Sequence, residues 1–199
     1  PGCTLCFMRI AADVMGGDGG CAVIIDGLLQ ALEHHDHIRT MYLVGDEENI
    51  RVSLGQAGHL ASRIEIVHSP EVLSMEEKPV VGLRRKKKCS LAMATDLVKH
   101  GQADAVLSAG NTGGMVAAAS IKLRTLPGVD RPGIATVMPT KTSNFVLLDA
   151  GANVEGKPRH LMHYAIMGDI YAREVLGKSR PRVGLLSVGT EEAKGNDLT

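Results

Sequence analysis

Short apolar segments alternate with helical patterns along this chain of 199 residues. We predict strands at residues 9–13, 40–44, 63–68, 103–108, 134–138, 146–149 and 182–187. Apolar periodicity and a helix-starting proline predict helices at residues 22–34, 47–57, 79–100, 115–123 and 159–176. Strands that alternate with helices in this way form a largely parallel sheet that helices cover on both faces. The sequence therefore predicts an α/β fold of that kind.

Polar turns that contain glycine follow strand segments at residues 13–18, 108–114, 149–153 and 189–196. Open parallel sheets bind their ligands at the carboxyl ends of the strands, which is where these turns fall. A sheet with only a structural role has less need of charged and amide side chains at so many strand ends. The repeated pattern favours a binding site, although glycine-rich turns often serve only to reverse the chain.

The turn at residues 108–114 (SAGNTGG) lies between a predicted strand and a helix of small residues. Free N–H groups and the positive end of the helix dipole make such a junction an anion site. The turn lacks the lysine of a Walker A loop and the spacing of a dinucleotide fingerprint, so it indicates recognition of phosphate or of an acyl oxygen. Asn111 or Thr112 can also cap the helix, a role compatible with binding. The candidate substrate-binding residues here are Ser108, Gly110, Asn111, Thr112 and Gly113.

Two aspartates flank the first glycine turn. Asp13 can position a ligand or a metal, and Gly16 and Gly17 belong to the same candidate site because glycine lets a backbone approach a ligand closely. For Asp18 we favour a different role, the capping of the helix that follows.

The later turns carry the remaining candidates. Asp149 and Asn153 suit the wall of a substrate pocket, and an Asx turn is the plain alternative. Glu191 and Lys194 lie beyond the last predicted strand. A lysine there can bind phosphate or stabilise a developing oxyanion, although most surface lysines are only solvated loop charges.

One basic cluster interrupts an otherwise balanced composition. The chain has 22 basic and 22 acidic residues, so no field of the whole molecule attracts nucleic acid or an anionic membrane. Residues 84–88 read RRKKK, but aromatic side chains for base stacking are scarce. We therefore expect an acidic protein or a phosphate to dock at this cluster, and no nucleic acid.

Cysteine and histidine spacing indicates no metal cofactor. The Cys-x-x-Cys pair at residues 3–6 has no second pair, and the histidines of residues 34–37 fall at a predicted helix end. No secretory signal or membrane span is visible, and the scattered cysteines suit a reducing cytoplasm. We expect residues 1–7 to be upstream sequence, and residues 8–199 to form a single α/β domain.

Several segments, taken in order, resemble the phosphate acyltransferases of bacterial phospholipid synthesis. Residues 8–18 (MRIAADVMGGD) resemble the opening of that family, and residues 108–113 (SAGNTG) resemble its central signature. Further matching blocks are GVDRP at 128–132, LDAGANV at 148–154, YAIMG at 164–168 and VGTEEAKGN at 188–196. Blocks that keep their order from Met8 to Thr199 make the resemblance highly specific.

The resemblance implies a Rossmann-like α/β/α sandwich, related to phosphate acetyltransferase and the isocitrate-dehydrogenase-like enzymes. It implies that a long acyl chain moves from the thioester of acyl carrier protein to inorganic phosphate, without a cofactor. The product, acyl phosphate, begins phosphatidic acid synthesis. A cytoplasmic homodimer is implied as well, with peripheral contact at the inner face of the membrane through family segments beyond Thr199. The chain would be the N-terminal portion of the family's catalytic unit.

By the same resemblance Lys194 is the catalytic candidate, and Asn111, Thr112 and Asn153 are pocket residues. Residues 19–21 (GGC) depart from the family, which usually has His-Ala-Pro there. Two alternatives stay open. One is a shortened, non-catalytic scaffold that binds carrier protein or itself, and the other is a short-chain phosphate acetyltransferase.

Overall fold

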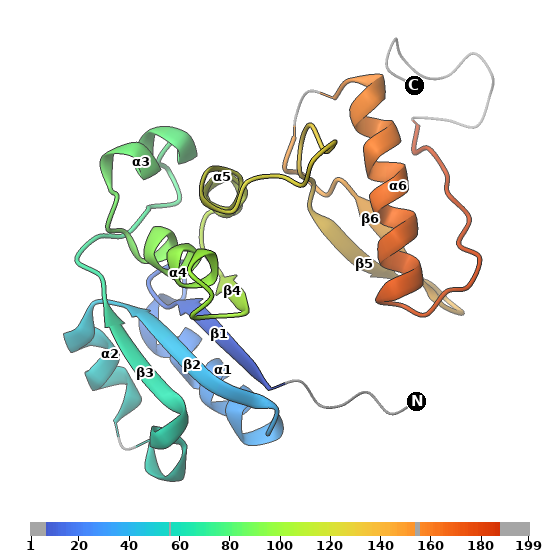
Figure 1. Cartoon of the computed structure of the whole chain (residues 1–199). Helices are drawn as coiled ribbons and strands as arrows, with labels where there is room; N and C mark the ends of the chain where they lie inside the picture. Colours follow the sequence, from blue (N-terminus) through green and yellow to red (C-terminus); the bar gives the residue numbers. More distant parts are fainter. Residues whose placement is uncertain (1–6, 56, 154–155, 188–199) are drawn as a thin grey trace. The chain divides into compact units, whose positions relative to one another are not determined.

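The computed structural model describes residues 7–55, 57–153 and 156–187. These residues fall in two compact units, within Pro1–Arg124 and Thr125–Thr199, and each unit is described by itself (Figure 1). The single domain expected over residues 8–199 stays a prediction. None of the helices in the described ranges is long and apolar enough to cross a membrane.

The first unit is built on a parallel sheet of four strands in the order β3-β2-β1-β4. The strands are β1 (Met8–Asp13), β2 (Ile38–Gly45), β3 (Ile64–His68) and β4 (Ala105–Ser108). The helices are α1 (Gly20–His34), α2 (Glu47–Leu54), the 3-10 helix η1 (Gly58–Arg63), α3 (Pro79–Arg85), α4 (Ser90–Lys99) and α5 (Thr112–Lys122). The parallel sheet predicted from the alternating pattern is confirmed.

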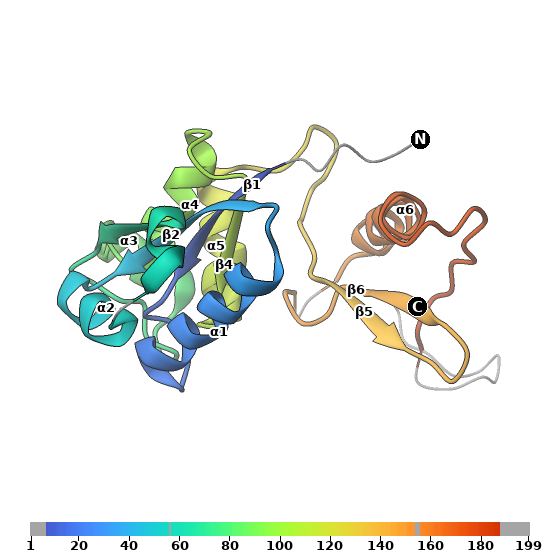
Figure 2. The ribbon, with the colours of Figure 1, turned by 90° about the horizontal axis from the view of Figure 1, so that it is seen from below.

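Helices cover both faces of this sheet, as Figures 1 and 2 show. Along β1, Ile10 and Ala12 pack into the core on the α1 side, while Ala11 packs into the core on the α4 side. This alternation follows from the pleat of a strand, which turns successive side chains to opposite faces. The buried residues of α1 recur at helical spacing and are Ile25, Leu28 and Leu32. The first unit therefore has the three layers of an α/β/α fold.

Local hydrogen bonds decide where the first helices begin. Asp46 caps α2, because its Oδ1 accepts the N–H of Asn49 at 3.0 Å. The cap predicted for α1 is wrong, since Gly19 is the N-cap residue and no side chain caps the helix. The glycine turn runs on to Gly20, whose φ is +74°, so Asp18 comes too early in the chain to cap α1.

The single helix predicted over residues 79–100 starts at Pro79 as expected, but it is wrong at residues 86–89, which separate α3 from α4. Residues 86–89 leave the helix because long-range contacts hold them. Lys86 Nζ reaches back to the carbonyl oxygen of Val72 at 2.9 Å and to Oε2 of Glu77 at 2.7 Å. Helical periodicity contains no information about such partners, so the sequence predicted a single helix.

The second unit pairs β5 (Ala135–Pro139) with β6 (Asn144–Leu148) in antiparallel register and packs α6 (Pro158–Glu174) against β6. These elements agree with the segments predicted there, but β5 and β6 form a separate antiparallel pair and are not strands of the predicted parallel sheet. The strand predicted at 182–187 is wrong, because residues 181–187 form no strand and no described segment pairs with their backbone. Alternating apolar residues make a strand only where a neighbour satisfies the backbone N–H and C=O groups.

Candidate functional site

Two polar turns meet at the carboxyl ends of β1 and β4. Asp13 and Ser108 are partners in the parallel register of these strands. The Ser108 hydroxyl donates to Oδ2 of Asp13 at 2.8 Å and accepts the N–H of Gly110 at 3.1 Å. The other carboxylate oxygen of Asp13 accepts the N–H of Met15 at 3.2 Å. The carboxylate, which is only 3% exposed, thus fixes the hydroxyl hydrogen of Ser108.

Glycines let the backbones of the two turns touch. A Cβ on Gly16 would lie 2.9 Å from Cα of Gly110 and 2.8 Å from Oδ2 of Asp13. A Cβ on Gly17 would lie 2.9 Å from the carbonyl oxygen of Ala109, and the φ of Gly17 is +92°. Side chains at either position would push the turns apart. In the structure, therefore, these glycines serve the contact between the turns; their predicted contact with substrate stays a prediction.

Asn111 links the second turn to the loop before α3. Its Oδ1 accepts the N–H of Gly114 at 2.8 Å and so caps α5, as one of the two sequence interpretations had it. Its Nδ2 donates to the carbonyl oxygen of Met75 at 3.0 Å. With both ends of the amide engaged, Asn111 fixes the start of α5 against the loop before α3, and its direct contact with a ligand stays a prediction.

The groups that remain open at this helix start are backbone N–H groups. Thr112 and Gly113 are exposed, and their N–H groups have no acceptor in the described ranges. The first N–H groups of a helix carry its positive partial charge, and they bind phosphate or carboxylate oxygens readily. The Thr112 hydroxyl is exposed beside them and can add a donor. This arrangement can hold an oxyanion at the start of α5.

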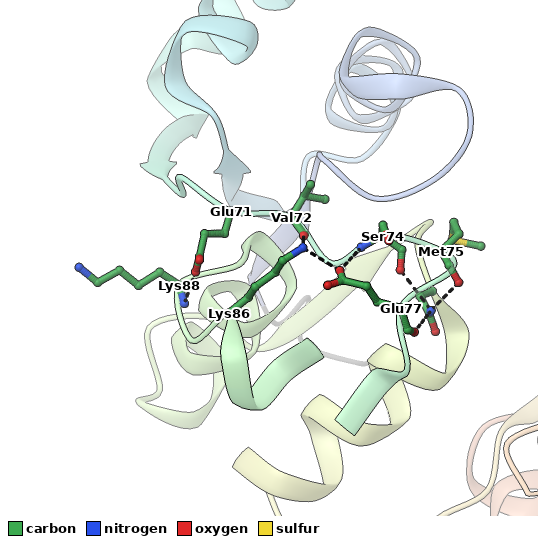
Figure 3. A network of polar contacts seen from close by, with 8 residues as sticks. Glu71, Val72, Ser74, Met75, Glu77, Lys86 and Lys88 are labelled. Carbon is green, nitrogen blue, oxygen red and sulfur yellow. Dashed lines mark hydrogen bonds and ion pairs between the residues drawn. The ribbon is translucent and has the colours of Figure 1, made fainter. Parts of the chain in front are cut away.

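An ion pair steadies the loop that holds Asn111 (Figure 3). Oε2 of Glu77 accepts the Lys86 ammonium at 2.7 Å and the N–H of Ser74 at 3.0 Å. The Lys86 ammonium lowers the pKa of Glu77, with a smaller contribution from the Ser74 N–H. Figure 3 shows Lys86 between this carboxylate and the Val72 carbonyl. Sequence patterns did not identify residues 71–77 as part of the site, because their contacts with Lys86 and Asn111 join segments that share no local pattern.

The turn after β6 belongs to the second unit and is satisfied internally. Oδ1 of Asp149 accepts the N–H of Ile134 at 2.8 Å and of Ala152 at 3.2 Å. Oδ2 accepts the N–H of Asn153 at 2.8 Å and its Nδ2 at 3.1 Å. Burial acts to raise the pKa of Asp149, but these hydrogen bonds outweigh it and lower the pKa. The local geometry is thus the Asx-type turn that the sequence offered as an alternative.

Asn153 also connects that turn to α6. Its Nδ2 lies 2.8 Å from the hydroxyl oxygen of Tyr164 and 3.0 Å from the carbonyl oxygen of Pro132. Tyr164 is 5% exposed, and burial raises the pKa of its hydroxyl, with the charge of Asp149 adding to the effect. The pocket role predicted for Asp149 and Asn153 stays a prediction. Glu191 and Lys194 lie outside the described residues.

The described cysteines do not have the environment of nucleophiles. Cys89 is fully buried and Cys21 is partly buried. Burial raises the pKa of both thiols, whereas a reactive cysteine needs a lowered pKa to form thiolate. No group of three or more His, Cys, Asp or Glu side chains in the described part of the chain is arranged to hold a metal.

Comparison with solved structures supports the fold. The EutD phosphotransacetylase from Staphylococcus aureus superposes with a TM-score of 0.60 and 22% sequence identity, over 83% of this chain and 52% of that one. At this identity the likeness concerns the fold alone. It agrees with the α/β class expected from the sequence.

Comparison with protein sequences identifies the family. A phosphate acyltransferase of Desulfitobacterium hafniense is 49% identical over 192 residues, which are 96% of this chain and 57% of the relative. The phosphate acyltransferase of Akkermansia muciniphila is 48% identical, over 96% of this chain and 55% of the relative. The chain thus spans a little over half the length of these relatives. The model of a family described as fatty acid synthesis protein matches residues 8–199. The chain therefore belongs to the family of fatty acid synthesis proteins that includes these phosphate acyltransferases.

Proposed function

We propose that this chain carries the phosphate-binding part of an enzyme that transfers an acyl group from a thioester to inorganic phosphate. The observation that carries the proposal is the start of α5, where the N–H groups of Thr112 and Gly113 have no acceptor among the described residues. This helix start directly follows the turn in which the Ser108 hydroxyl accepts the N–H of Gly110. Relatives that are about half identical to the chain bear the name phosphate acyltransferase, which supports the same reaction class.

The proposed reaction needs no covalent enzyme intermediate. An oxygen of hydrogen phosphate attacks the thioester carbon, a C–O bond forms, and the C–S bond breaks as the tetrahedral intermediate collapses. The proton of hydrogen phosphate ends on the sulfur, so the products are acyl phosphate and a free thiol. The raised thiol pKa of Cys89 fits direct attack better than a cysteine nucleophile.

Ser108 and Asp13 have a specific part in this scheme. The hydroxyl hydrogen of Ser108 points to Asp13, so Ser108 meets a ligand as a hydrogen-bond acceptor. Such an acceptor suits the remaining P–OH group of hydrogen phosphate, while the N–H groups of α5 suit its charged oxygens. The pair thus orients the phosphate with its proton toward Ser108.

The other parts of the proposal rest on the sequence. Lys194 would neutralise the oxyanion of the tetrahedral intermediate, with Glu191, Asp149 and Asn153 around the substrate. The acyl donor would be long-chain acyl carrier protein, the product would be acyl phosphate for phosphatidic acid synthesis, and the enzyme would act as a homodimer in the cytoplasm or at the inner face of the membrane.

The direct test incubates the purified chain with long-chain acyl carrier protein and phosphate. Acyl phosphate is trapped with hydroxylamine and measured as hydroxamate. We expect product with the carrier substrate and little with acetyl-CoA. Preference for acetyl-CoA would indicate a phosphate acetyltransferase, and carrier binding without any product would indicate a scaffold.

A further inference from the structure

A hollow of about 440 Å³ lies between α3, α4 and α5, entirely within the first unit. Its apolar lining comes from Leu83, Ala118 and Ile121. Leu83 and Ala118 are buried, but Ile121 is 54% exposed. An exposed isoleucine on the wall of a concave surface offers apolar area that a partner can cover.

Basic side chains surround this apolar lining. Arg84, Lys87 and Lys99 line the hollow and are exposed. None of the three forms an ion pair within the described ranges. Lys122, by contrast, is bound to Asp96 at 2.5 Å. The hollow therefore combines an apolar wall with a rim of uncompensated positive charge.

The helix ends around the hollow indicate where a bound anion can lie. Lys99 is the last residue of α4 and Lys122 the last residue of α5, so both helices present their carboxyl-terminal ends here. A helix dipole stabilises cations in the last turn, which accounts for these two lysines without any ligand. It does not account for Lys87, which lies outside the helices, or for the exposed Ile121.

The carboxyl-terminal helix ends favour a protein surface over a small anion as the ligand of the hollow. Carboxyl-terminal ends offer carbonyl oxygens in place of N–H donors, so a small anion deep in the hollow would meet partial negative charge. Negative groups belong at the rim, where long basic side chains reach them, and an apolar group belongs in the hollow. A protein surface with carboxylates around an apolar side chain meets both conditions.

We propose that this hollow docks an acidic protein, and, resting on the proposed function, that this protein is the acyl carrier. Helix α5 connects the hollow to the proposed phosphate site, because Ile121 lies at the hollow and Gly113 lies at the start of the helix. Their separation along the helix is about 12 Å, at a rise of about 1.5 Å per residue. A carrier held at the hollow therefore has its thioester arm close to the bound phosphate.

The experiment compares two double variants of the full 199-residue chain. Arg84→Glu with Lys87→Glu changes two residues of the hollow. The matched control is Arg85→Glu with Lys88→Glu, which makes the same charge change in the same segment at exposed residues outside the hollow. Binding of acidic acyl carrier protein is measured by fluorescence anisotropy, with circular dichroism to verify folding.

We expect the hollow variant to raise the Kd for carrier protein about ten-fold or more, and the control to change it less than about three-fold. The Ile121→Ser variant, which leaves every charge in place, should weaken binding as well. Equal weakening by both charge variants, or binding untouched by all three, would overturn the docking site. So would vesicles of anionic phospholipid that bind through the hollow while carrier protein does not.

A small substrate separates this proposal from the proposed reaction. Acyl-pantetheine has the thioester arm but no protein, so the hollow variant should keep its turnover with acyl-pantetheine and lose turnover with acyl carrier protein. Absence of turnover with both substrates in the unaltered chain would count against the proposed reaction, and the binding measurements would still decide the docking site.

Discussion

The Ser108 hydroxyl donates a hydrogen bond of 2.8 Å to Oδ2 of Asp13, from a neighbouring parallel strand in direct register. The bond joins the ends of two strands that are 95 residues apart in the chain. It also leaves Ser108 without a hydrogen to donate elsewhere, so this serine can meet a ligand only through its lone pairs. The polarity of the site is thus set by a carboxylate that is itself almost fully buried.

Ser108→Ala should lower turnover in a protein that still folds. The substitution removes two hydrogen bonds, the one that Ser108 donates to Asp13 and the one that it accepts from Gly110, and each contributes about 1 kcal/mol net to folding. Turnover on acyl carrier protein and phosphate should fall at least ten-fold, with the larger part of the change in the KM for phosphate. Hydroxamate formation measures turnover, and urea unfolding measures stability. Unaltered kinetics in a folded variant would remove Ser108 from the site.

Gly16→Ala should destabilise the first unit strongly. The added Cβ would lie 2.8 Å from the Asp13 carboxylate and 2.9 Å from backbone atoms of Gly110, so the turns must separate. We expect a loss of about 1–3 kcal/mol in the free energy of unfolding, the range of overpacked sites.

Gly27→Ala is the matched control for this substitution. Gly27 lies within α1, and a Cβ there would meet no atom within 4 Å. This variant should be more stable by about 0.5–1 kcal/mol, because alanine has the better helix propensity. Equal effects of the two substitutions would show that the turns are not in close contact.

Two substitutions at Asn111 should separate its two roles. Asn111→Ala removes the cap of α5 and the bond to Met75, and it should cost about 1–2 kcal/mol. Asn111→Asp keeps the capping oxygen but turns a carboxylate oxygen toward the Met75 carbonyl, and it adds a negative charge next to the proposed phosphate site. The KM for phosphate should therefore rise more in the aspartate variant than in the alanine variant. An aspartate variant with the parent KM would place phosphate elsewhere.

Asp104 should contribute a pH-dependent part of the stability. The Arg9 guanidinium, together with the Arg9 N–H, lowers the pKa of Asp104 from 3.8 to about 2. Because the pKa in the folded state is below the unfolded value, this contribution is present above about pH 4 and is lost as the pH falls toward 2. Asp104→Asn should lower the urea midpoint at neutral pH.

The difference between this variant and the parent protein should shrink as the pH falls from about 4 through about 2, because the Asp104 carboxyl takes up its proton over that range. Asp18→Asn, at an exposed aspartate of the first glycine turn, is the control for a general effect of one lost charge. A midpoint difference that stayed constant from neutral to acid pH would contradict the assignment to the Arg9–Asp104 pair.

The strands of the first unit could be predicted because each is a short apolar segment between helical patterns, as the strands of a parallel sheet buried on both faces are. The break between α3 and α4 could not, since it depends on Lys86 reaching Val72 and Glu77 from outside the helix. The strand predicted at 182–187 failed for a related reason, because strand formation depends on a partner that a local pattern cannot supply.

The candidate site, like the fold, was predictable in part. Turns at the ends of parallel strands share one edge of a sheet, so the approach of residues 13–18 and 108–114 followed from the sequence. The capping role of Asn111 was one of two interpretations. Its bond to Met75 was not foreseen, because it joins residues with no shared local pattern.

The contact between Gly16 and Gly110 limits how the anion site can be redesigned. Gly16, Gly17 and Gly110 have no room for a side chain, so a change of ligand preference cannot start from these glycines. Thr112 is exposed at the open end of α5. In directed evolution toward sulfate, arsenate or a bulkier phosphate ester, the first substitutions that change ligand preference should therefore occur at position 112.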